Sequence, residues 1–228
     1  MDHLASRTAV VIAAYNEAAV IGDVVRDARR LFSTVVVVDD GSRDSTAGDA
    51  FAAGATVLVH PINLGQGAAL QTGIAYACRE GYEYIVTFDA DGQHRPEDAV
   101  AMVHALQDSG AQVALGSRFL GAAESIPAAR RWLLRAATVF TRLTTGLRVT
   151  DAHNGLRALR ADAAARIRIR QNRMAHASEI LEEIARHGLR YVEVPVVVRY
   201  TEYSMAKGQS GFGAFNIVLD LFLARLRK

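Results

Sequence analysis

The stretch Tyr84-Ile85-Val86-Thr87-Phe88-Asp89-Ala90-Asp91-Gly92-Gln93 reads as a buried strand that stops at two carboxylates. The carboxylates are spaced i, i+2, and a glycine and an amide follow at once. Hard oxygen ligands at the end of a central strand suit Mg²⁺ or Mn²⁺, which can in turn hold a diphosphate. This short motif gains its meaning from what the rest of the chain places beside it.

Further apolar, β-branched runs at 8–13, 35–38, 56–59 and 112–116 read as strands, and helical spacing recurs between them. Such alternation favours βαβ units, so we expect an α/β fold with a mostly parallel central sheet flanked by helices. A later strand is expected at 192–198, where Pro195 favours an edge or a bulge. The tail at 215–228 is expected to form an amphipathic helix.

Polar clusters follow three of the expected strands, namely Tyr15-Asn16-Glu17, Asp39-Asp40-Gly41-Ser42 and Asp89-Ala90-Asp91. In parallel α/β sheets, ligands bind beyond the carboxyl ends of the strands. We therefore expect the three clusters to converge in space and to form one binding site.

The overall composition narrows the possible functions. The 228 residues suffice for a single domain, and 26 basic against 24 acidic residues give no case for nucleic acid. The single cysteine, Cys78, excludes an internal disulfide. We recognise no signal peptide and no window of eighteen strongly apolar residues, so we expect a cytoplasmic chain without a transmembrane span.

Two common nucleotide-binding classes lack their glycine signatures. A dinucleotide-binding dehydrogenase needs G-x-G-x-x-G directly after the first strand, where this chain has Ala13-Ala14-Tyr15-Asn16-Glu17. The later Gly65-x-Gly67 has Leu70 at the third glycine position. No G-x-x-x-x-G-K-[ST] loop occurs, which disfavours a P-loop kinase or ATPase.

Several motifs, in order along about residues 8–210, resemble glycosyltransferase family 2, which has the GT-A fold. Within it, the chain is most similar to polyprenyl-phosphate sugar transferases of the dolichyl-phosphate mannose synthase type. The matching segments are Ala14-Tyr15-Asn16-Glu17, Val38-Asp39-Asp40-Gly41-Ser42-x-Asp44-x-Thr46, Asn63-Leu64-Gly65-Gln66-Gly67-Ala68-Ala69-Leu70, Asp89-Ala90-Asp91-Gly92-Gln93, Gly116-Ser117-Arg118 and Asp151-x-x-x-Gly155.

The resemblance implies an inverting transfer from a UDP- or GDP-linked sugar with Mg²⁺ or Mn²⁺. Residues 1–117 would bind the nucleotide sugar and residues 118–228 the acceptor. Asp89, Asp91 and Gln93 would hold the metal, whereas His94 is expected to be a solvated loop residue. The residues implied in binding the donor are Ala14, Tyr15, Glu17, Asp39, Asp40, Gln66, Gly67, Asp89, Ala90, Asp91, Arg131 and Ser204.

The acceptor implied by the resemblance is a polyprenyl phosphate, whose anionic head Arg118 and Arg131 would bind. Asp151 or Glu179 would act as base for a hydroxyl acceptor such as a glycan, whereas an ionised phosphate barely needs one. Ser204 and Lys207 lie in a loop expected to close over the diphosphate. The implied catalytic set is Asp89, Asp91, Arg118, Asp151, Glu179 and Lys207. A non-catalytic nucleotide-sugar-binding protein is the alternative from another class.

A lipid-phosphate acceptor requires contact with a bilayer. The basic segment at 130–148 and the amphipathic tail fit helices that lie at a membrane surface, so we expect a peripheral protein at the inner face of the membrane. Many members of the family carry C-terminal membrane spans and this sequence shows none. We therefore expect either a small membrane-protein partner or a soluble acceptor.

Overall fold

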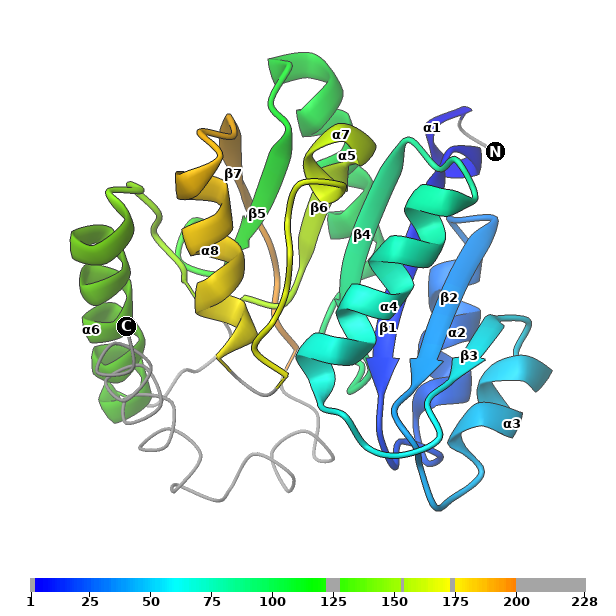
Figure 1. Cartoon of the computed structure of the whole chain (residues 1–228). Coiled ribbons are helices and arrows are strands. Elements are labelled where there is room, and N and C mark those ends of the chain that lie inside the picture. Colours follow the sequence, from blue (N-terminus) through cyan, green and yellow to red (C-terminus); the bar gives the residue numbers. More distant parts are fainter. Residues whose placement is uncertain (1–2, 122–127, 153, 173–174, 200–228) are drawn as a thin grey trace.

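A seven-stranded sheet separates two layers of helices (Figure 1). The computed structural model describes residues 3–121, 128–152, 154–172 and 175–199, and for residues 3 and 128–134 only the backbone. The expected C-terminal amphipathic helix at 215–228 lies outside the described residues. Among the described residues, no helix is both long and apolar enough to cross a lipid bilayer.

The strands run in the order β3-β2-β1-β4-β6-β5-β7. Strand β6 is antiparallel to both of its neighbours, and the other neighbouring strands are parallel. The sheet is therefore mostly parallel, as the sequence predicts. The strands are β1 (Thr8–Ala14), β2 (Thr34–Asp39), β3 (Thr56–Val59), β4 (Tyr84–Asp89), β5 (Val113–Ser117), β6 (Arg157–Arg160) and β7 (Tyr191–Pro195).

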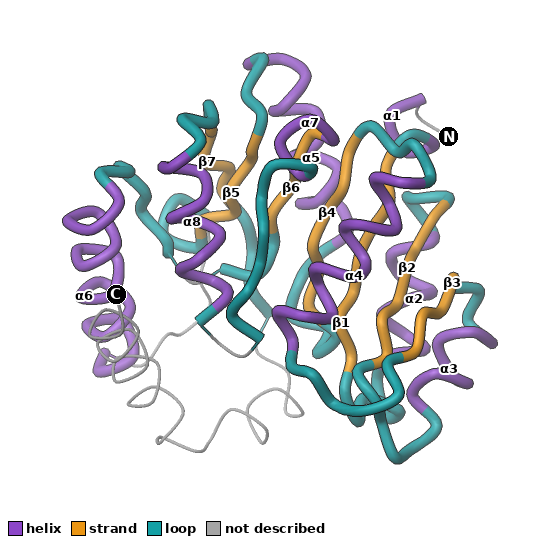
Figure 2. The backbone as a smooth tube through the Cα atoms, viewed as in Figure 1, coloured by secondary structure: helices purple, strands orange, loops and turns teal. Residues whose placement is uncertain are grey.

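Both faces of the central strands are buried, because alternate residues enter two separate cores. In β1, Val10 and Ile12 pack with helices α2 and α5, whereas Ala9 and Val11 pack with α4 and α8. Helix α6 packs against α8, away from the sheet (Figure 2). The helices are α1 (His3–Ser6), α2 (Ile21–Arg29), α3 (Thr46–Ala52), α4 (Gln66–Arg79), α5 (Pro96–Ser109), α6 (Ala128–Thr145), α7 (Ala161–Ala164) and α8 (His176–Arg186).

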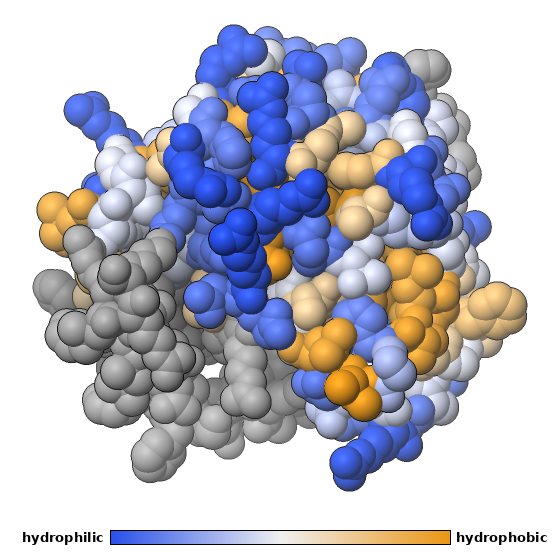
Figure 3. Space-filling model, viewed as in Figure 1, coloured by the Kyte–Doolittle hydropathy of each residue, from blue (hydrophilic) through white to orange (hydrophobic). Residues whose placement is uncertain are grey.

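Strands β7 and β3 form the two edges of the sheet. Strand β7 is the edge strand after β5, and Pro195 is its last residue, as expected for a proline that cannot donate to a ladder. At the other edge, β3 has only four residues. Phe51, Val59 and Ile62 are exposed near this edge, and hydrophobic surface gathers over this region in Figure 3.

Candidate active site

The carboxyl ends of β1, β2 and β4 meet at one edge of the sheet. The register places Ala14 beside Asp39 and Ala13 beside Asp89. The three polar clusters that follow these strands therefore converge, as their positions in the sequence predict. Strand β6 also contributes to this edge, because it runs in the opposite direction and begins here at Arg157.

The loops after β1 and β2 are tied to each other by side chains. The backbone N–H of Asn16 donates to the Ser42 hydroxyl at 2.9 Å, and that of Glu17 donates to the Thr46 hydroxyl at 2.8 Å. Asn16 has a φ of 53°, a left-handed conformation that asparagine tolerates better than most residues. The two loops therefore form one fixed wall of the site.

The predicted nucleoside residues lie along this wall. Ala14, Glu17 and Asp39 are buried, whereas Tyr15 is 39% exposed. The Asp39 carboxylate accepts hydrogen bonds from the backbone N–H and the hydroxyl of Ser42. The loop that begins at Tyr15 therefore presents an aromatic ring, while the Asp39 carboxylate is held by the neighbouring turn.

Asp40 holds the next loop in place. Its carboxylate lies 2.7 Å from Nδ1 of His60 and accepts the backbone N–H groups of Leu64 at 3.0 Å and Gly65 at 2.7 Å. These contacts fix the segment that leads into α4. We therefore give Asp40 a positioning role and leave it out of the proposed set of donor contacts.

Gly67 is explained by contact between two segments of the chain. Its N–H donates to the carbonyl oxygen of Asn172 at 2.9 Å, and a β-carbon at position 67 would overlap the carbonyl oxygen of Gln171. Gly67 thus allows residues 171–172 to pack against the start of α4, so a donor contact by its N–H is not proposed. The side chain of Gln66 reaches the site, because its amide donates to Asp89 Oδ1 at 3.4 Å.

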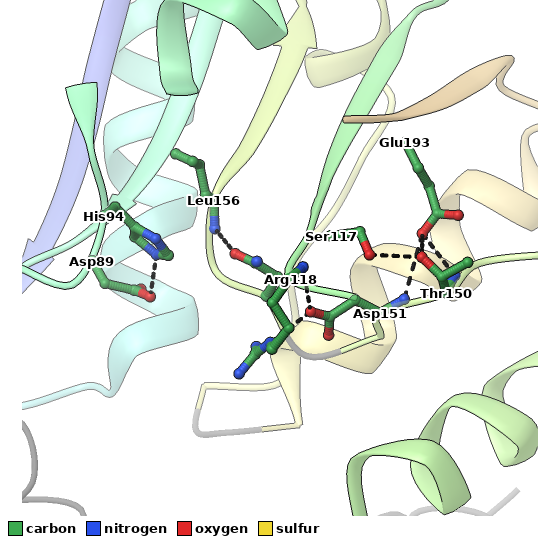
Figure 4. A network of polar contacts seen from close by, with 9 residues as sticks. Asp89, His94, Ser117, Arg118, Thr150, Asp151, Leu156 and Glu193 are labelled. Carbon is green, nitrogen blue, oxygen red and sulfur yellow. Dashed lines mark hydrogen bonds and ion pairs between the residues drawn. The ribbon is translucent and has the colours of Figure 1, made fainter. Parts of the chain in front are cut away.

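Asp89 is held by a buried histidine. Nε2 of His94 lies 2.8 Å from Asp89 Oδ2 (Figure 4). The His94 ring packs edge-on against Phe88, with their centroids 5.4 Å apart. His94 is only 5% exposed, so the expectation that it is a solvated loop residue is wrong. Within the described part of the chain, its buried Nδ1 has no hydrogen-bond partner.

The two carboxylates of the motif have opposite pKa shifts. Burial works to raise the pKa of Asp89, but the charges of His94 and Arg157 prevail and lower it. Burial and the neighbouring charge of Asp89 raise the pKa of Asp91. Two carboxylates that repel each other in a partly enclosed site are stabilised by a bound cation.

The donor set suits a hard divalent cation that is also bound by a ligand. Among the described residues, no group of three or more His, Cys, Asp or Glu side chains is arranged to hold a metal ion. The Asp89 and Asp91 carboxylates offer oxygen ligands, while the Gln93 N–H donates to Asp91 Oδ1 at 3.0 Å and orients it. Mg²⁺ is commonly bound by one or two carboxylates together with substrate phosphates, which this site can accommodate.

Gly155 supports the Asp89 carboxylate from below. Its carbonyl oxygen accepts a hydrogen bond from the Thr87 hydroxyl at 2.8 Å, and a β-carbon at position 155 would overlap both carboxylate oxygens of Asp89. The Asp151-x-x-x-Gly155 segment therefore needs a glycine so that it can pack against the end of β4.

We expect Gly155→Ala to lower sugar transfer by about 100-fold, because a shift of about 1 Å in a catalytic group can cost that much. Gly48→Ala is the matched control, since a β-carbon at Gly48 meets no atom within 4 Å. The control should keep its activity and gain about 0.5–1 kcal/mol in α3 stability. Initial rates and thermal melts of both variants check this, and full activity of Gly155→Ala would contradict the packing argument.

Arg118 and Asp151 form a buried ion pair on the other side of the site (Figure 4). Nε of Arg118 lies 2.6 Å from Asp151 Oδ2, and the Arg118 backbone N–H donates to the same oxygen at 3.2 Å. Glu193 on β7 fixes the segment by accepting the N–H of Thr150 at 2.7 Å and its hydroxyl at 2.8 Å. This network holds the positively charged Arg118 side chain in a fixed position near the end of β5.

Glu179 anchors a loop. Its carboxylate accepts the backbone N–H groups of Arg170 at 2.9 Å and Gln171 at 2.7 Å. Both hydrogen bonds reach Oε2, so the carboxylate positions this loop, and a role of Glu179 as a base stays a prediction. The same loop, through residues 171–172, packs on the start of α4.

Arg157 was missed by the sequence analysis. It is buried, and its charge acts on Asp89. The available signal was an arginine inside the apolar run Leu156-Arg157-Ala158-Leu159, two residues after Gly155. Three other predicted residues cannot be placed, because Ser204, Lys207 and the Arg131 side chain lie outside the part of the chain that the structure describes.

The fold is that of the GT-A class, as a comparison with solved structures shows. Glucosyl-3-phosphoglycerate synthase from Mycobacterium tuberculosis, solved with phosphoglyceric acid, matches with a TM-score of 0.73 at 21% identity, over 92% of this chain and 77% of that one. Its complex with Mn²⁺, UDP-glucose and phosphoglyceric acid matches with a TM-score of 0.69 at 22% identity, over 86% and 71% of the two chains.

The glycosyl transferase family 2 model matches residues 9–168, so the chain belongs to this family and is a glycosyltransferase. A UDP-N-acetylglucosamine–dolichyl-phosphate N-acetylglucosaminyltransferase from Methanococcus voltae is 30% identical over 96% of each chain. A polyprenol monophosphomannose synthase from Mycolicibacterium smegmatis is 30% identical over 88% of this chain and 80% of its own.

Proposed function

We propose that this glycosyltransferase moves a sugar from a nucleoside-diphosphate sugar to a polyprenyl phosphate, with Mg²⁺ or Mn²⁺. The observation that carries the proposal is the placement of two charged groups at one edge of the sheet. Asp89 and Asp91 offer oxygen ligands to a cation, and the buried Arg118 places a positive charge at the end of β5. A cation for the leaving diphosphate and an arginine for an anionic acceptor are what this reaction requires.

On the donor side, the nucleoside lies against the wall formed by Tyr15, Glu17 and Asp39. Asp89 and Asp91, with Gln93, hold the cation, which neutralises the charge that develops on the leaving diphosphate. The fold match that contains Mn²⁺ and UDP-glucose supports this assignment. His94 and Gln66 keep the Asp89 carboxylate oriented toward the cation.

On the acceptor side, two observations support the proposal of a phosphate over a hydroxyl group. A hydroxyl acceptor needs a general base, whereas a phosphate is already ionised near neutral pH. The two candidate bases are both engaged, Asp151 with Arg118 and Glu179 with two backbone N–H groups. The relatives named for dolichyl phosphate and polyprenol monophosphomannose, and an undecaprenyl-phosphate mannosyltransferase from Micrococcus luteus, support a lipid phosphate.

A lipid acceptor places part of the protein at a membrane surface, and α6 has suitable properties. Leu143 is 82% exposed on this helix, Val139 is also exposed, and the exposed Arg135 carries positive charge. Exposed apolar and basic side chains on one helix suit the interface of an anionic bilayer. We propose peripheral association through α6, and the inner membrane face and a small membrane-protein partner stay predictions.

The decisive experiment measures nucleotide binding and transfer separately. UDP, GDP and their sugars are first screened by thermal shift with Mn²⁺ and with EDTA, and we expect one base to stabilise the protein in a Mn²⁺-dependent way. The matching nucleoside-diphosphate sugar, radiolabelled in the sugar, is then offered to vesicles with and without a polyprenyl phosphate and, separately, to a glycan. Label should enter the lipid only when the phosphate is present. Transfer to a glycan alone would support a hydroxyl acceptor, and binding without any transfer would support a non-catalytic protein.

A further inference from the structure

Arg157 occupies a place between the donor and acceptor sides of the site. It is the first residue of β6, where it pairs with Thr87 of β4 and Leu115 of β5. Asp89 lies two residues beyond Thr87, and Arg118 lies three residues beyond Leu115. Cross-strand partners project from the same face of a sheet, so Arg157, Thr87 and Asp89 share one face.

The Arg157 guanidinium makes few hydrogen bonds for a buried group. The residue is 2% exposed, and Nη2 donates to the carbonyl oxygen of Ala177 at a long 3.4 Å. Within the described residues, the buried Nη1 has no hydrogen-bond partner. A buried cation with an unsatisfied donor destabilises a fold unless other charges compensate it. Packing alone therefore does not account for an arginine at this position.

The compensating charges come from both halves of the site. Burial lowers the pKa of Arg157 to about 10, and the carboxylates of Asp89 and Asp151 act against this shift. The guanidinium is thus still charged at neutral pH. Asp89 belongs to the proposed metal site, and Asp151 is the partner of Arg118 on the acceptor side.

We propose that Arg157 is a positioning residue whose buried charge balances Asp89 and Asp151 together and so sets the net charge of the whole site. This inference rests on the proposed function, because it concerns the cation and the phosphates that the reaction needs. Arg157 acts through space on groups that bind the ligands. It opposes cation binding and favours anion binding at the same site.

If Arg157 has this role, removing its charge should change the affinities for Mn²⁺ and for a nucleoside diphosphate in opposite directions. Arg157→Met removes the charge but keeps a long unbranched side chain. We expect it to bind Mn²⁺ alone about threefold more tightly or better, and to bind UDP or GDP at saturating Mn²⁺ about tenfold more weakly. Arg157→Lys keeps the charge and should restore both affinities to within about threefold of the wild-type values.

The matched control is Arg160→Met on the same strand, because Arg160 is exposed and pairs with Asp162 at the surface. It should leave both affinities unchanged. Mn²⁺ binding is measured by electron paramagnetic resonance of the free ion, and nucleotide binding by calorimetry. Thermal melts of every variant confirm that it is folded.

The outcomes separate this inference from the proposed function. A wild-type protein that binds no nucleotide would overturn the proposed function. The Mn²⁺ affinities of the wild type and of Arg157→Met would still test whether the charge of Arg157 acts on the cation site. If Arg157→Met weakens both ligands and Arg157→Lys restores neither, Arg157 has only a structural role. If neither affinity changes while wild-type binding is normal, Arg157 does not set the charge of the site.

Discussion

Asp91→Asn is expected to lower sugar transfer by at least about 100-fold, because it removes one of the two carboxylates that we propose hold the cation beside the leaving diphosphate. The side chain keeps its size, and Oδ1 can still accept the Gln93 N–H. The change therefore acts on charge and metal affinity, with the loop geometry kept. The measurement is the initial rate at increasing Mn²⁺, where the variant should need a higher concentration and reach a lower maximum.

The same substitution should leave the protein at least as stable as the wild type. The pKa of Asp91 is raised by burial and by the charge of Asp89, so its ionised form is less stable in the folded protein than in the unfolded chain. A group of this kind destabilises the fold at pH values above its unfolded pKa, and the neutral amide removes that effect. The melting temperature at neutral pH should therefore stay level or rise.

Asp108→Asn is the control for this experiment, since Asp108 is exposed near the end of α5. It removes the same charge far from the motif and should change neither the rate nor the metal dependence. Normal transfer by Asp91→Asn would rule out the assigned metal site. A large fall in its melting temperature would show instead that Asp91 is needed for folding.

The features that were predicted correctly from the sequence are those that depend on residues close together along the chain. Strand ends at Ala14, Asp39 and Asp89 follow from local apolar runs, and their convergence follows from the general behaviour of parallel sheets. Strand β6 was not expected, because its four residues are too short to show a clear period and it gains stability from β4 and β5. The fold was thus predicted except for its antiparallel strand.

The roles that sequence could not reveal depend on contacts between distant segments. His94 reads as a loop residue until its contacts with Asp89 and Phe88 show that it is buried. Glu179 is predicted from the sequence as a candidate base, and the structure adds that its carboxylate accepts the N–H groups of residues 170 and 171. The boundary between a donor half at 1–117 and an acceptor half at 118–228 also stays a prediction. Gly155 packs directly against Asp89, so the later half also shapes the donor site.

The second large effect is expected from the buried pair Arg118 and Asp151. Removing one member of a buried ion pair typically costs about 3–5 kcal/mol of stability, because a charge stays buried beside a neutral group. We therefore expect both Arg118→Met and Asp151→Asn to lower the free energy of unfolding by that amount. The exposed pair Arg160 and Asp162 is the matched control, where the loss should stay below about 1 kcal/mol.

The rates of the same variants distinguish a base from an orienting residue. If Asp151 orients Arg118 toward an acceptor phosphate, the two single variants and the double variant should lose similar activity, because each removes the same positioned cation. If Asp151 were a general base, Asp151→Asn would lose far more activity than Arg118→Met, and the loss would depend on pH. We expect the first outcome, because Asp151 Oδ2 lies 2.6 Å from Arg118 Nε and Glu193 fixes the segment that carries Asp151.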